Sequence, residues 1–434
     1  MTKRAFKWRS FWRSERSCLR HLFLLLLLTT TMAFDWKTMM DRTQTSVQSA
    51  IEWAGYHSGL ADQCCYVDKP STAARNHLTE HIIAQHLAVE SIIAAIEAWE
   101  FARPTAKDRI PLVLAFTGPT GTGKTETSYV LARSIFKHTR NLYKSDKKVA
   151  SGLLMIRGED FSDNFTNPVT TYHRLIKSML VDHLIHCSGN AIVVFDEVQK
   201  VIPHTLDVLM EAMSNSAQLS YTVGGVTSTL DTSNVIFILI SDIGVSQMMG
   251  LIRKYPSRNE VSALKLEQTV KAALDAQWKR LEFGKIVNKV VPFLPLQQPD
   301  IQSIIASKLE TMDRTYRGKR WHRLWIDPSL PQHLSLLDSI HYEQRKVTIN
   351  GETTLIQLYA KYGARNVENG PLQQLKSKLF RFLRPWNSDS EVKITIDVGT
   401  NTISIIACAA EKNGSQDAEL IPVDCVTRWK GMIE

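Results

Sequence analysis

The 434-residue sequence lacks several features that would assign it to a specialised class of protein. It has six cysteines, but no Cys-x-x-Cys pair and no Cys/His spacing of the kind that binds zinc. It has no internal repeat and no RNP-like aromatic pattern. Hydrophobic residues make up 44% and charged residues 22%, the balance of an ordinary globular chain with room for two or three domains. Such a chain can bury a sizeable core and does not need disulfides merely to fold.

The net charge of +9 does not indicate a nucleic-acid partner once the charges are located. Most of the excess positive charge lies in the first twenty residues, where Glu15 is the single acid among Lys3, Arg4, Lys7, Arg9, Arg13, Arg16 and Arg20. In the rest of the chain acids and bases are mixed, as on a solvated surface. We therefore expect no nucleic acid among the partners.

A leader is predicted over residues 1–34. Its basic start precedes the apolar run HLFLLLLLTTTMAF, which is short for a membrane span of roughly twenty residues. A signal peptide cleaved near Thr31-Met32-Ala33 and an uncleaved signal anchor both fit. Both place the rest of the chain in the lumen of the endoplasmic reticulum, because the basic side stays cytosolic. A mitochondrial presequence is the alternative, although the leucine run is very apolar for one.

The adjacent pair Cys64-Cys65 is the unusual cysteine feature. In an oxidising lumen one of the two is expected to pair with a distant cysteine, and the alternative is that they are free buried thiols. Cys187, Cys408 and Cys425 are the other cysteines beyond the leader. Asn164 and Asn413 stand in sequons and would accept glycans in the same compartment.

The loop GPTGTGKT fits the pattern of a phosphate-binding loop. It follows the apolar run 110–116 and precedes a helical pattern at 125–138, which is the strand, loop and helix context that such a loop needs. Lys124 is expected to reach the β- and γ-phosphates of a nucleotide, and the Thr125 hydroxyl to bind Mg²⁺. The predicted nucleotide-binding residues are Gly118, Pro119, Thr120, Gly121, Thr122, Gly123, Lys124 and Thr125.

A second motif favours hydrolysis of the nucleotide over mere binding. Asp196 and Glu197 end the apolar run AIVVFDE, about seventy residues after the loop. Asp196 is expected to hold Mg²⁺, directly or through water, and Glu197 to polarise the attacking water as general base. ATP and Mg²⁺ are therefore the predicted cofactors.

Buried apolar runs alternate with helical patterns, which predicts an α/β fold with a doubly wound parallel sheet flanked by helices. Strands are expected at 110–116, 152–158, 191–197 and 234–241, and helices at 76–101, 125–138, 172–187 and 204–213. A smaller helical lid is expected from helices at 299–316, 330–344 and 355–362, followed by a terminal β-hairpin. The predicted domains are the leader, a connector at 35–75, a nucleotide-binding domain at 76–295, the lid at 296–386 and a C-terminal β extension at 387–434.

Several segments resemble the second ATPase module of Clp-type AAA+ unfoldases. They are DEVQKVIPHTLDVLMEAM and NVIFILISDIG, the stretch LTEHIIAQHLA before the loop, VVPFLPL, and YGAR at 362–365. Within that group QHLA, GTGK, VPFLPL and ADQCC resemble the torsins, AAA+ ATPases of the endoplasmic reticulum lumen. The resemblance covers about residues 50–385. It implies that Ile83 lies beside the adenine, that Asp242 is the first sensor, and that Arg365 contacts the γ-phosphate as the second sensor.

The chain departs from the torsin pattern in ways that bear on hydrolysis. Torsins typically have Asn at the end of the loop and a Gly-Cys-Lys second sensor, where this chain has Thr125 and Gly-Ala-Arg. Asp242 replaces the usual Asn and adds negative charge, which would slow hydrolysis or weaken ATP binding. Ile286 stands where Clp-type proteins carry an arginine finger, with Lys285 or Arg280 as possible substitutes. Torsins also lack this finger and need an activator that supplies it.

The aromatic pore loop of Clp unfoldases is replaced here by EDFSDNFTNPVTTY. Phe161, Phe165 and Tyr172 are candidates to grip substrate, but packing is the favoured interpretation. The sequence thus predicts a luminal, membrane-associated ATPase that remodels protein partners. It would form a ring or filament and need a membrane-anchored activator. The alternatives are a Clp-like unfoldase of an organelle and a nucleotide-gated scaffold with suppressed hydrolysis.

Overall fold

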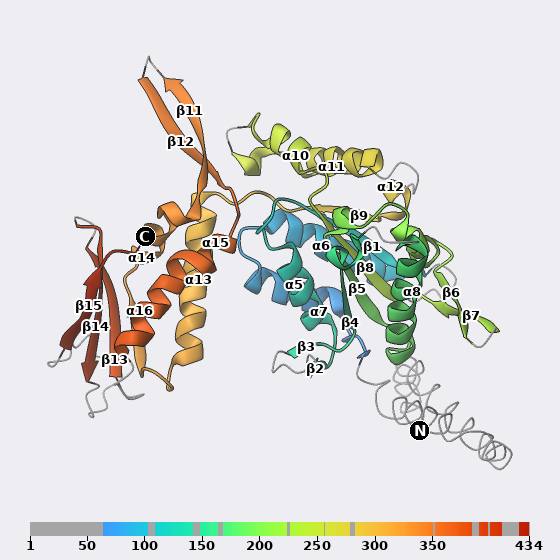
Figure 1. Ribbon diagram of the computed structural model, residues 1–434, viewed down its shortest axis with the longest axis horizontal. Helices are drawn as coiled ribbons and strands as arrows, with labels where there is room; N and C mark the ends of the chain where they lie inside the picture. The colour runs from blue at the N-terminus through green and yellow to red at the C-terminus, as the bar shows by residue number, and fades with distance from the viewer. Residues whose placement is uncertain are drawn as a thin grey trace, which may run out of the picture.

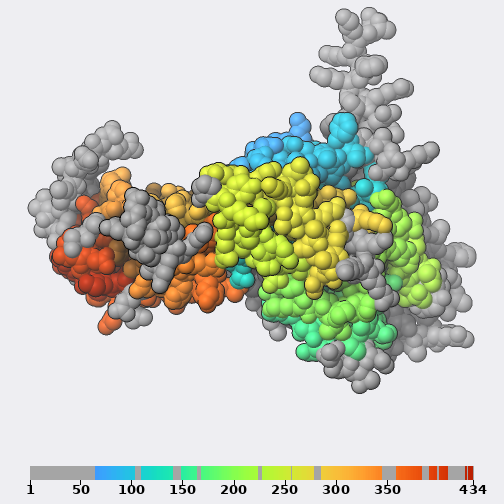
Figure 2. Space-filling model, turned by 90° about the horizontal axis from the view of Figure 1, so that it is seen from above, coloured from blue at the N-terminus to red at the C-terminus, as the bar shows by residue number. Residues whose placement is uncertain are grey.

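The computed structural model describes residues 64–102, 109–141, 148–163, 168–223, 226–255, 257–277, 283–349, 352–383, 390–397, 400–409 and 425–433. The leader, most of the connector, both sequons, Phe165 and Arg280 lie outside these ranges. The described residues form two lobes (Figure 1). Seen from above, the orange and red second lobe lies beside the larger lobe (Figure 2).

The larger lobe is built on a five-stranded, fully parallel sheet in the order β4-β5-β8-β1-β9. Apart from the edge strand β4, its strands are apolar and buried along nearly their whole length, as parallel strands covered on both faces must be. The predicted doubly wound sheet is confirmed. The strands are β1 (Leu112–Thr117), β4 (Leu153–Arg157), β5 (Ala191–Asp196), β8 (Val235–Ser241) and β9 (Lys289–Pro292).

Helices cover both faces of this sheet because successive side chains of a strand point to opposite sides. Leu114 and Phe116 of β1 pack with helices on one face, and Val113 and Ala115 pack with helices on the other. The first face carries α5 (Pro70–His81), α6 (His86–Ala102) and α7 (Lys124–Ile135). The second carries α8 (Pro168–His186), α10 (Val245–Ile252) and α11 (Ala263–Gln277).

The larger lobe begins earlier in the chain than expected. Cys64 and Tyr66, assigned to the connector, are buried in its core, and the Tyr66 hydroxyl donates to the Ala191 and Asn234 carbonyls at 3.0 and 2.7 Å. The helix predicted at 76–101 is in fact two helices. A turn at 82–85 separates them, and Ala84 there has a φ of 65° that no helix accommodates.

Two further differences concern the segment between β5 and β8. The helix predicted at 204–213 is a 3-10 turn, η4 (Thr205–Leu209), followed by the four-residue α9 (Met210–Met213). The loop expected after it contains an antiparallel hairpin, β6 (Gln218–Val223) and β7 (Val226–Asp231). The Gly224-Gly225 pair between two β-rich runs is the sequence signal for this hairpin.

A second small hairpin joins β2 (Thr139–Asn141) and β3 (Lys148–Ala150).

The second lobe is not the purely helical bundle that the sequence predicted. Its first helix, α13 (Gln298–Tyr316), is confirmed and starts with a capping box between Gln297 and Asp300. Of the helix predicted at 330–344 only the start is helical, as α14 (Leu330–Ser335). The helix predicted at 355–362 is wrong, because most of that run lies in a strand. β11 (Tyr342–Ile349) and β12 (Glu352–Ala360) form an antiparallel hairpin that projects from the lobe (Figure 1). Asn350-Gly351 in the sequence is a strong signal for such a turn.

The C-terminal strands belong to the core of the second lobe. β13 (Ser390–Asp397) and β14 (Thr402–Ala409) form the predicted terminal hairpin, and β15 (Cys425–Gly431) pairs with β14. β10 (Arg323–Ile326) adds to β13 in parallel, so residues of the expected lid and of the expected extension share one sheet. Val392 and Ile405 pack in one core with α13 and with α16 (Gln373–Leu383). The extension is therefore not a separate unit.

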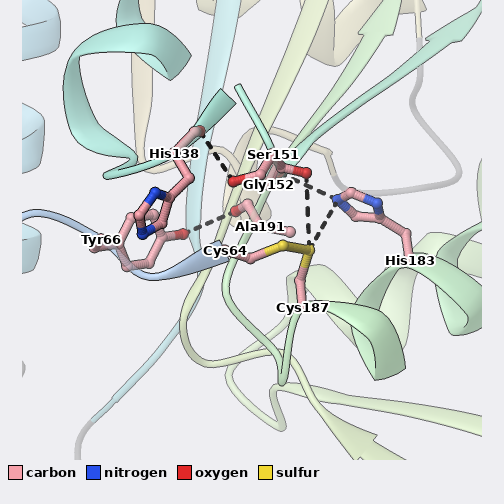
Figure 3. The surroundings of a disulfide bond; sticks show 8 residues. All are labelled: Cys64, Tyr66, His138, Ser151, Gly152, His183, Cys187 and Ala191. Carbon is pink, nitrogen blue, oxygen red and sulfur yellow. Dashed lines mark hydrogen bonds between the residues drawn. A yellow bond between two sulfur atoms is a disulfide. The ribbon is translucent and has the colours of Figure 1, made fainter. Parts of the chain in front are cut away.

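A disulfide joins Cys64 to Cys187, 123 residues apart, at the end of α8 (Figure 3). The prediction that one of the adjacent cysteines pairs with a distant one is confirmed. Both cysteines are fully buried, and His183 lies beside them with its ring nitrogen 3.2 Å from the Gly152 carbonyl. Cys408 is also disulfide-bonded.

None of the helices in the described ranges is long and apolar enough to cross a membrane.

Candidate nucleotide-binding site

The glycine-rich loop lies at the carboxyl edge of the sheet, between β1 and the start of α7. The Gly118 N–H donates to the Ser241 carbonyl at 3.4 Å, which ties the loop to the end of β8. Gly123 caps α7 with a φ of 97°, and the space beside its Cα is open. A helix N-terminus with free N–H groups and an open approach suits an anion. The loop therefore has the form that a phosphate chain requires.

Lys124, the first residue of α7, bends back over the loop. Its ammonium donates to the carbonyls of Gly118 and Pro119 at 2.6 and 2.8 Å. Burial lowers the pKa of Lys124 to about 8, and the nearby carboxylates of Asp196, Asp242 and Glu197 oppose that shift. A bound phosphate would offer this ammonium a stronger, charged acceptor than two carbonyls do.

The structure brings the predicted charged residues together around this lysine. Asp196 and Glu197 end β5, and Asp242 follows β8, its neighbour in the sheet. The Arg365 guanidinium lies close enough to lower the pKa of Lys124 further. Two carboxylates at the tip of β5, one at β8 and a cation from the second lobe thus converge on the loop, and their catalytic roles stay predictions.

Thr125 and Asp196 are in contact. The Thr125 hydroxyl donates to Asp196 Oδ2 at 2.9 Å, so the two predicted Mg²⁺ ligands lie side by side. Both offer oxygen, the ligand that Mg²⁺ prefers, and Mg²⁺ at phosphate sites takes only one or two carboxylates besides phosphate and water. Among the described residues no cluster of three or more His, Cys, Asp and Glu side chains could hold a metal. The oxygen atoms of Thr125 and Asp196, with a single carboxylate between them, fit a magnesium ion that also contacts a nucleotide.

The second lobe rests directly on the glycine-rich loop. The Ala364 N–H donates to the Gly121 carbonyl at 2.9 Å. Gly121 has a φ of 75°, and a Cβ there would lie 2.2 Å from the Tyr362 carbonyl oxygen. A Cβ on Gly363, which has a φ of 55°, would lie 2.4 Å from the Gly121 oxygen. Only glycine fits at either place, and α15 (Arg365–Val367) begins at once with the predicted sensor.

A buried glutamine that we did not single out from the sequence fixes the loop from the other side. Gln85 follows Ile83 in the turn between α5 and α6. Its amide donates to the Thr122 carbonyl at 3.2 Å and to the Leu294 carbonyl at 2.9 Å, and it accepts from the Leu294 N–H at 3.0 Å. Gln85 thus joins the loop to the segment that leads into the second lobe. Ile83 lies in the same turn, and its contact with adenine stays a prediction.

Arg258 is a second residue that sequence reasoning missed. It is 4% exposed and lies in the 3-10 turn η5 (Arg258–Glu260). It donates to the carbonyls of Ala84 and Pro295 at 2.9 and 2.6 Å, and it pairs with Asp300 of α13 at 2.8 Å. Burial raises the pKa of Asp300, and the Arg258 cation opposes that shift. The pair anchors α13 against the turn that holds Gln85.

Comparison with known proteins gives three kinds of match. The Torsin family model matches residues 60–195. ClpB 2 of Parasynechococcus marenigrum is 26% identical over 61% of this chain and 27% of its own length. The human mitochondrial disaggregase is 26% identical over 66% of this chain and 42% of its own length. A torsin-like protein of Caenorhabditis elegans is 25% identical over 60% of this chain and 73% of its own length.

A solved structure supports the fold. The Hsp104–ADP complex of S. cerevisiae superposes with a TM-score of 0.52 at 19% identity, covering 76% of this chain and 51% of that one. Over the matched residues this chain is similar to torsins and to Clp-type AAA+ chaperones, and its fold is similar to that of Hsp104. The matched parts span only 27% to 44% of the length of the ClpB 2 and bovine disaggregase relatives.

The structure also places residues that the sequence analysis considered for the arginine finger and for the pore loop. Ile286 and Lys285 lie in the short helix α12 (Phe283–Ile286). Phe161 and Tyr172 are 5% and 4% exposed and meet edge to face at 5.1 Å, so they pack in the core. The favoured interpretation, packing rather than gripping substrate, is confirmed for these two residues.

The pKa of Lys124 predicts a pH dependence for ATP binding. Below about pH 8 the ammonium is already charged, so binding needs no proton there. Above that pH, binding must restore the proton, and the affinity should fall by up to about tenfold per pH unit. The empty folded protein should also gain stability as the pH rises from about 8 to 10.5, because the unfolded chain then binds more protons than the folded chain.

Calorimetry of ATP binding in buffers with different ionisation enthalpies checks this expectation. Proton uptake should be near zero at pH 7 and should approach one proton at pH 9. Lys124→Arg is the matched control, since arginine keeps its charge throughout and should bind ATP with no added uptake. Equal uptake by the wild-type protein at both pH values would contradict the assignment.

Proposed function

We propose that this chain is an ATP-hydrolysing, chaperone-like remodelling protein of the torsin type, acting on protein partners on the luminal side of the endoplasmic reticulum membrane. The convergence of Lys124, Thr125, Asp196 and Glu197 at one edge of the sheet carries the hydrolytic part of this proposal. The buried disulfide supports the compartment, because such bonds persist in oxidising lumens and are rare in cytosolic proteins.

In this mechanism the loop and the Lys124 ammonium bind the phosphates. Arg365 contacts the γ-phosphate, so the position of the second lobe depends on whether that phosphate is present. Glu197 accepts the proton of the attacking water, and Asp242 helps to orient that water. Mg²⁺, when bound, would be held by Thr125 and Asp196 and would neutralise charge on the phosphates. The contact between Gly121 and the 362–364 segment couples the phosphates to the lobe, since any movement of the loop displaces that segment.

An activator is part of the proposal. Ile286 at the finger position cannot stabilise the charge of the transition state, and an arginine supplied in trans is worth about 10³–10⁵ in turnover. We infer that the chain assembles as a homo-oligomer and receives this arginine from a membrane-anchored partner. Asp242 adds to the need for a partner, because its negative charge beside the phosphates opposes nucleotide binding.

The deciding experiment measures ATP turnover of the full chain in detergent micelles, alone and with solubilised reticulum membranes. Low turnover alone and a large rise with membranes are expected. Brisk turnover alone would contradict the activator and favour a Clp-like unfoldase, for which the mitochondrion is the alternative location. ATP binding without turnover under either condition would favour a nucleotide-gated scaffold.

A further inference from the structure

The predicted base Glu197 does not stand alone at the tip of β5. Strands β4 and β5 are neighbours, with Arg157 opposite Asp196, so the residues that follow them lie at the same edge. Glu159 follows β4 in the 3-10 helix η2 (Gly158–Phe161). Lys200 ends the 3-10 helix η3 (Val198–Lys200), which follows Glu197. Two carboxylates and one ammonium therefore meet at the end of the sheet.

Lys200 binds both carboxylates at once. Its Nζ lies 2.7 Å from Glu197 Oε2 and also contacts Glu159 Oε1. Hydrogen bonding to Lys200 lowers the pKa of Glu159. One ammonium is thus shared between a predicted catalytic carboxylate and a second carboxylate to which no role has been assigned.

The backbone fixes this arrangement. Glu197 has a φ of 57°, a sparsely populated conformation for a non-glycine residue, and the Lys200 N–H donates to its carbonyl at 2.9 Å. A Cβ on Gly158 would lie 2.2 Å from that same carbonyl oxygen, so the turns after β4 and β5 are in direct contact. The tight turn after Glu197 brings the lysine three residues later back onto the glutamate side chain.

We propose that Lys200 is a positioning residue that restrains Glu197 and keeps hydrolysis slow until the ammonium shifts towards Glu159. This inference rests on the proposed function, since it assumes that Glu197 acts as the base. To accept a proton from water, Glu197 must point a carboxylate oxygen at that water, and the contact of Lys200 with Oε2 holds the carboxylate in another direction, towards η3. A full shift of Lys200 to Glu159 frees Glu197 without any change in proton count.

The three side chains can respond to changes in the protein because they are partly exposed. Glu197 and Lys200 are 40% and 41% exposed, and Glu159 is 58% exposed. Pairs at this exposure hold weakly, and for that reason the restraint is expected to be modest. The Ile202 N–H donates to the Phe161 carbonyl at 3.1 Å, so movement of η2 is passed to the segment that follows Lys200.

Opposite effects are expected from removing the two partners of the base. In Lys200→Gln the ammonium is absent, and kcat without membranes should rise roughly two- to fivefold, with KM for ATP unchanged. In Glu159→Gln the ammonium has one charged partner left and binds Glu197 more tightly, so kcat should fall. The double variant should behave like Lys200→Gln, and Lys200→Arg should keep the slow wild-type rate.

The test measures kcat and KM for ATP with the full chain in detergent micelles, with Lys319→Gln, an exposed lysine of the second lobe, as the matched control. A rise that disappears when Glu197→Gln is added supports the inference. A kcat for Lys200→Gln at or below the wild-type value overturns it, whatever membranes do to the wild-type protein. If membranes activate the wild-type protein in that case, the proposed function stands alone, and if they do not, both fail.

Discussion

Glu197→Gln is expected to abolish ATP turnover while ATP still binds. The amide keeps the shape of the side chain but cannot accept a proton from water, and loss of a general base costs about 10²–10⁴ in rate. The nucleotide contacts of the loop and of Lys124 are unchanged in this variant, so affinity should stay within about threefold of wild type. Turnover in the presence of membranes and binding of a fluorescent ATP analogue measure the two quantities separately.

Lys124→Ala is the matched comparison, because it should lose both binding and turnover. Removing its ammonium leaves the carboxylates of Asp196 and Asp242 facing the phosphates without a cation from the loop. If Glu197→Gln retained more than about a tenth of the wild-type rate, the base would have to be another group. Asp242 at the end of β8 would then be the first candidate.

Removing the disulfide is expected to have the largest effect on stability. The bond closes a loop over a sequence separation of 123 residues, and chain-entropy arguments give about 5 kcal/mol for a loop of that length. Measured losses on removing native bonds are typically about 2–5 kcal/mol. Cys187→Ser and Cys64→Ser should each lower the thermal midpoint of the larger lobe by a similar amount, because either change removes the same bond.

Cys65→Ser provides the control, since it changes the neighbouring cysteine and leaves the bond intact. Circular dichroism of protein made in an oxidising compartment measures the midpoint, and non-reducing peptide mapping should recover Cys64 joined to Cys187. Equal losses in Cys65→Ser and Cys64→Ser would contradict the pairing. Near-wild-type stability of Cys187→Ser would contradict the expected contribution of the bond.

The sequence was most informative where chemistry constrains both residue type and spacing. The loop 118–125 and the Asp196-Glu197 pair could be located because each follows a buried apolar strand. The carboxyl ends of parallel strands share one edge of the sheet, so their meeting also followed from the strand pattern. The sheet itself was predictable for the same reason, as fully buried strands leave long apolar runs.

Errors arose where local pattern allowed two answers. Short runs such as 355–362 fit a helix or a strand by periodicity alone, and the Asn350-Gly351 pair in the sequence is the signal that favours a hairpin. The helix predicted at 76–101 is interrupted at Ala84, although its apolar spacing continues. The terminal hairpin of β13 and β14 was predicted and β15 was not, and the pairing of β13 with β10 joins residues about seventy positions apart.

By itself the sequence determined the class of protein, the phosphate loop, the Asp196-Glu197 pair and the two-lobed α/β design. Tertiary structure decided which groups act on those residues. Glu159 reaches the Glu197–Lys200 pair only because β4 and β5 are adjacent, and Gln85 reaches Thr122 only because a turn before α6 packs under the loop. The choice of Cys64 over Cys65 likewise depends on which one points into the core towards α8. Contacts between distant segments follow from burial and pairing of whole elements, which short-range spacing does not encode.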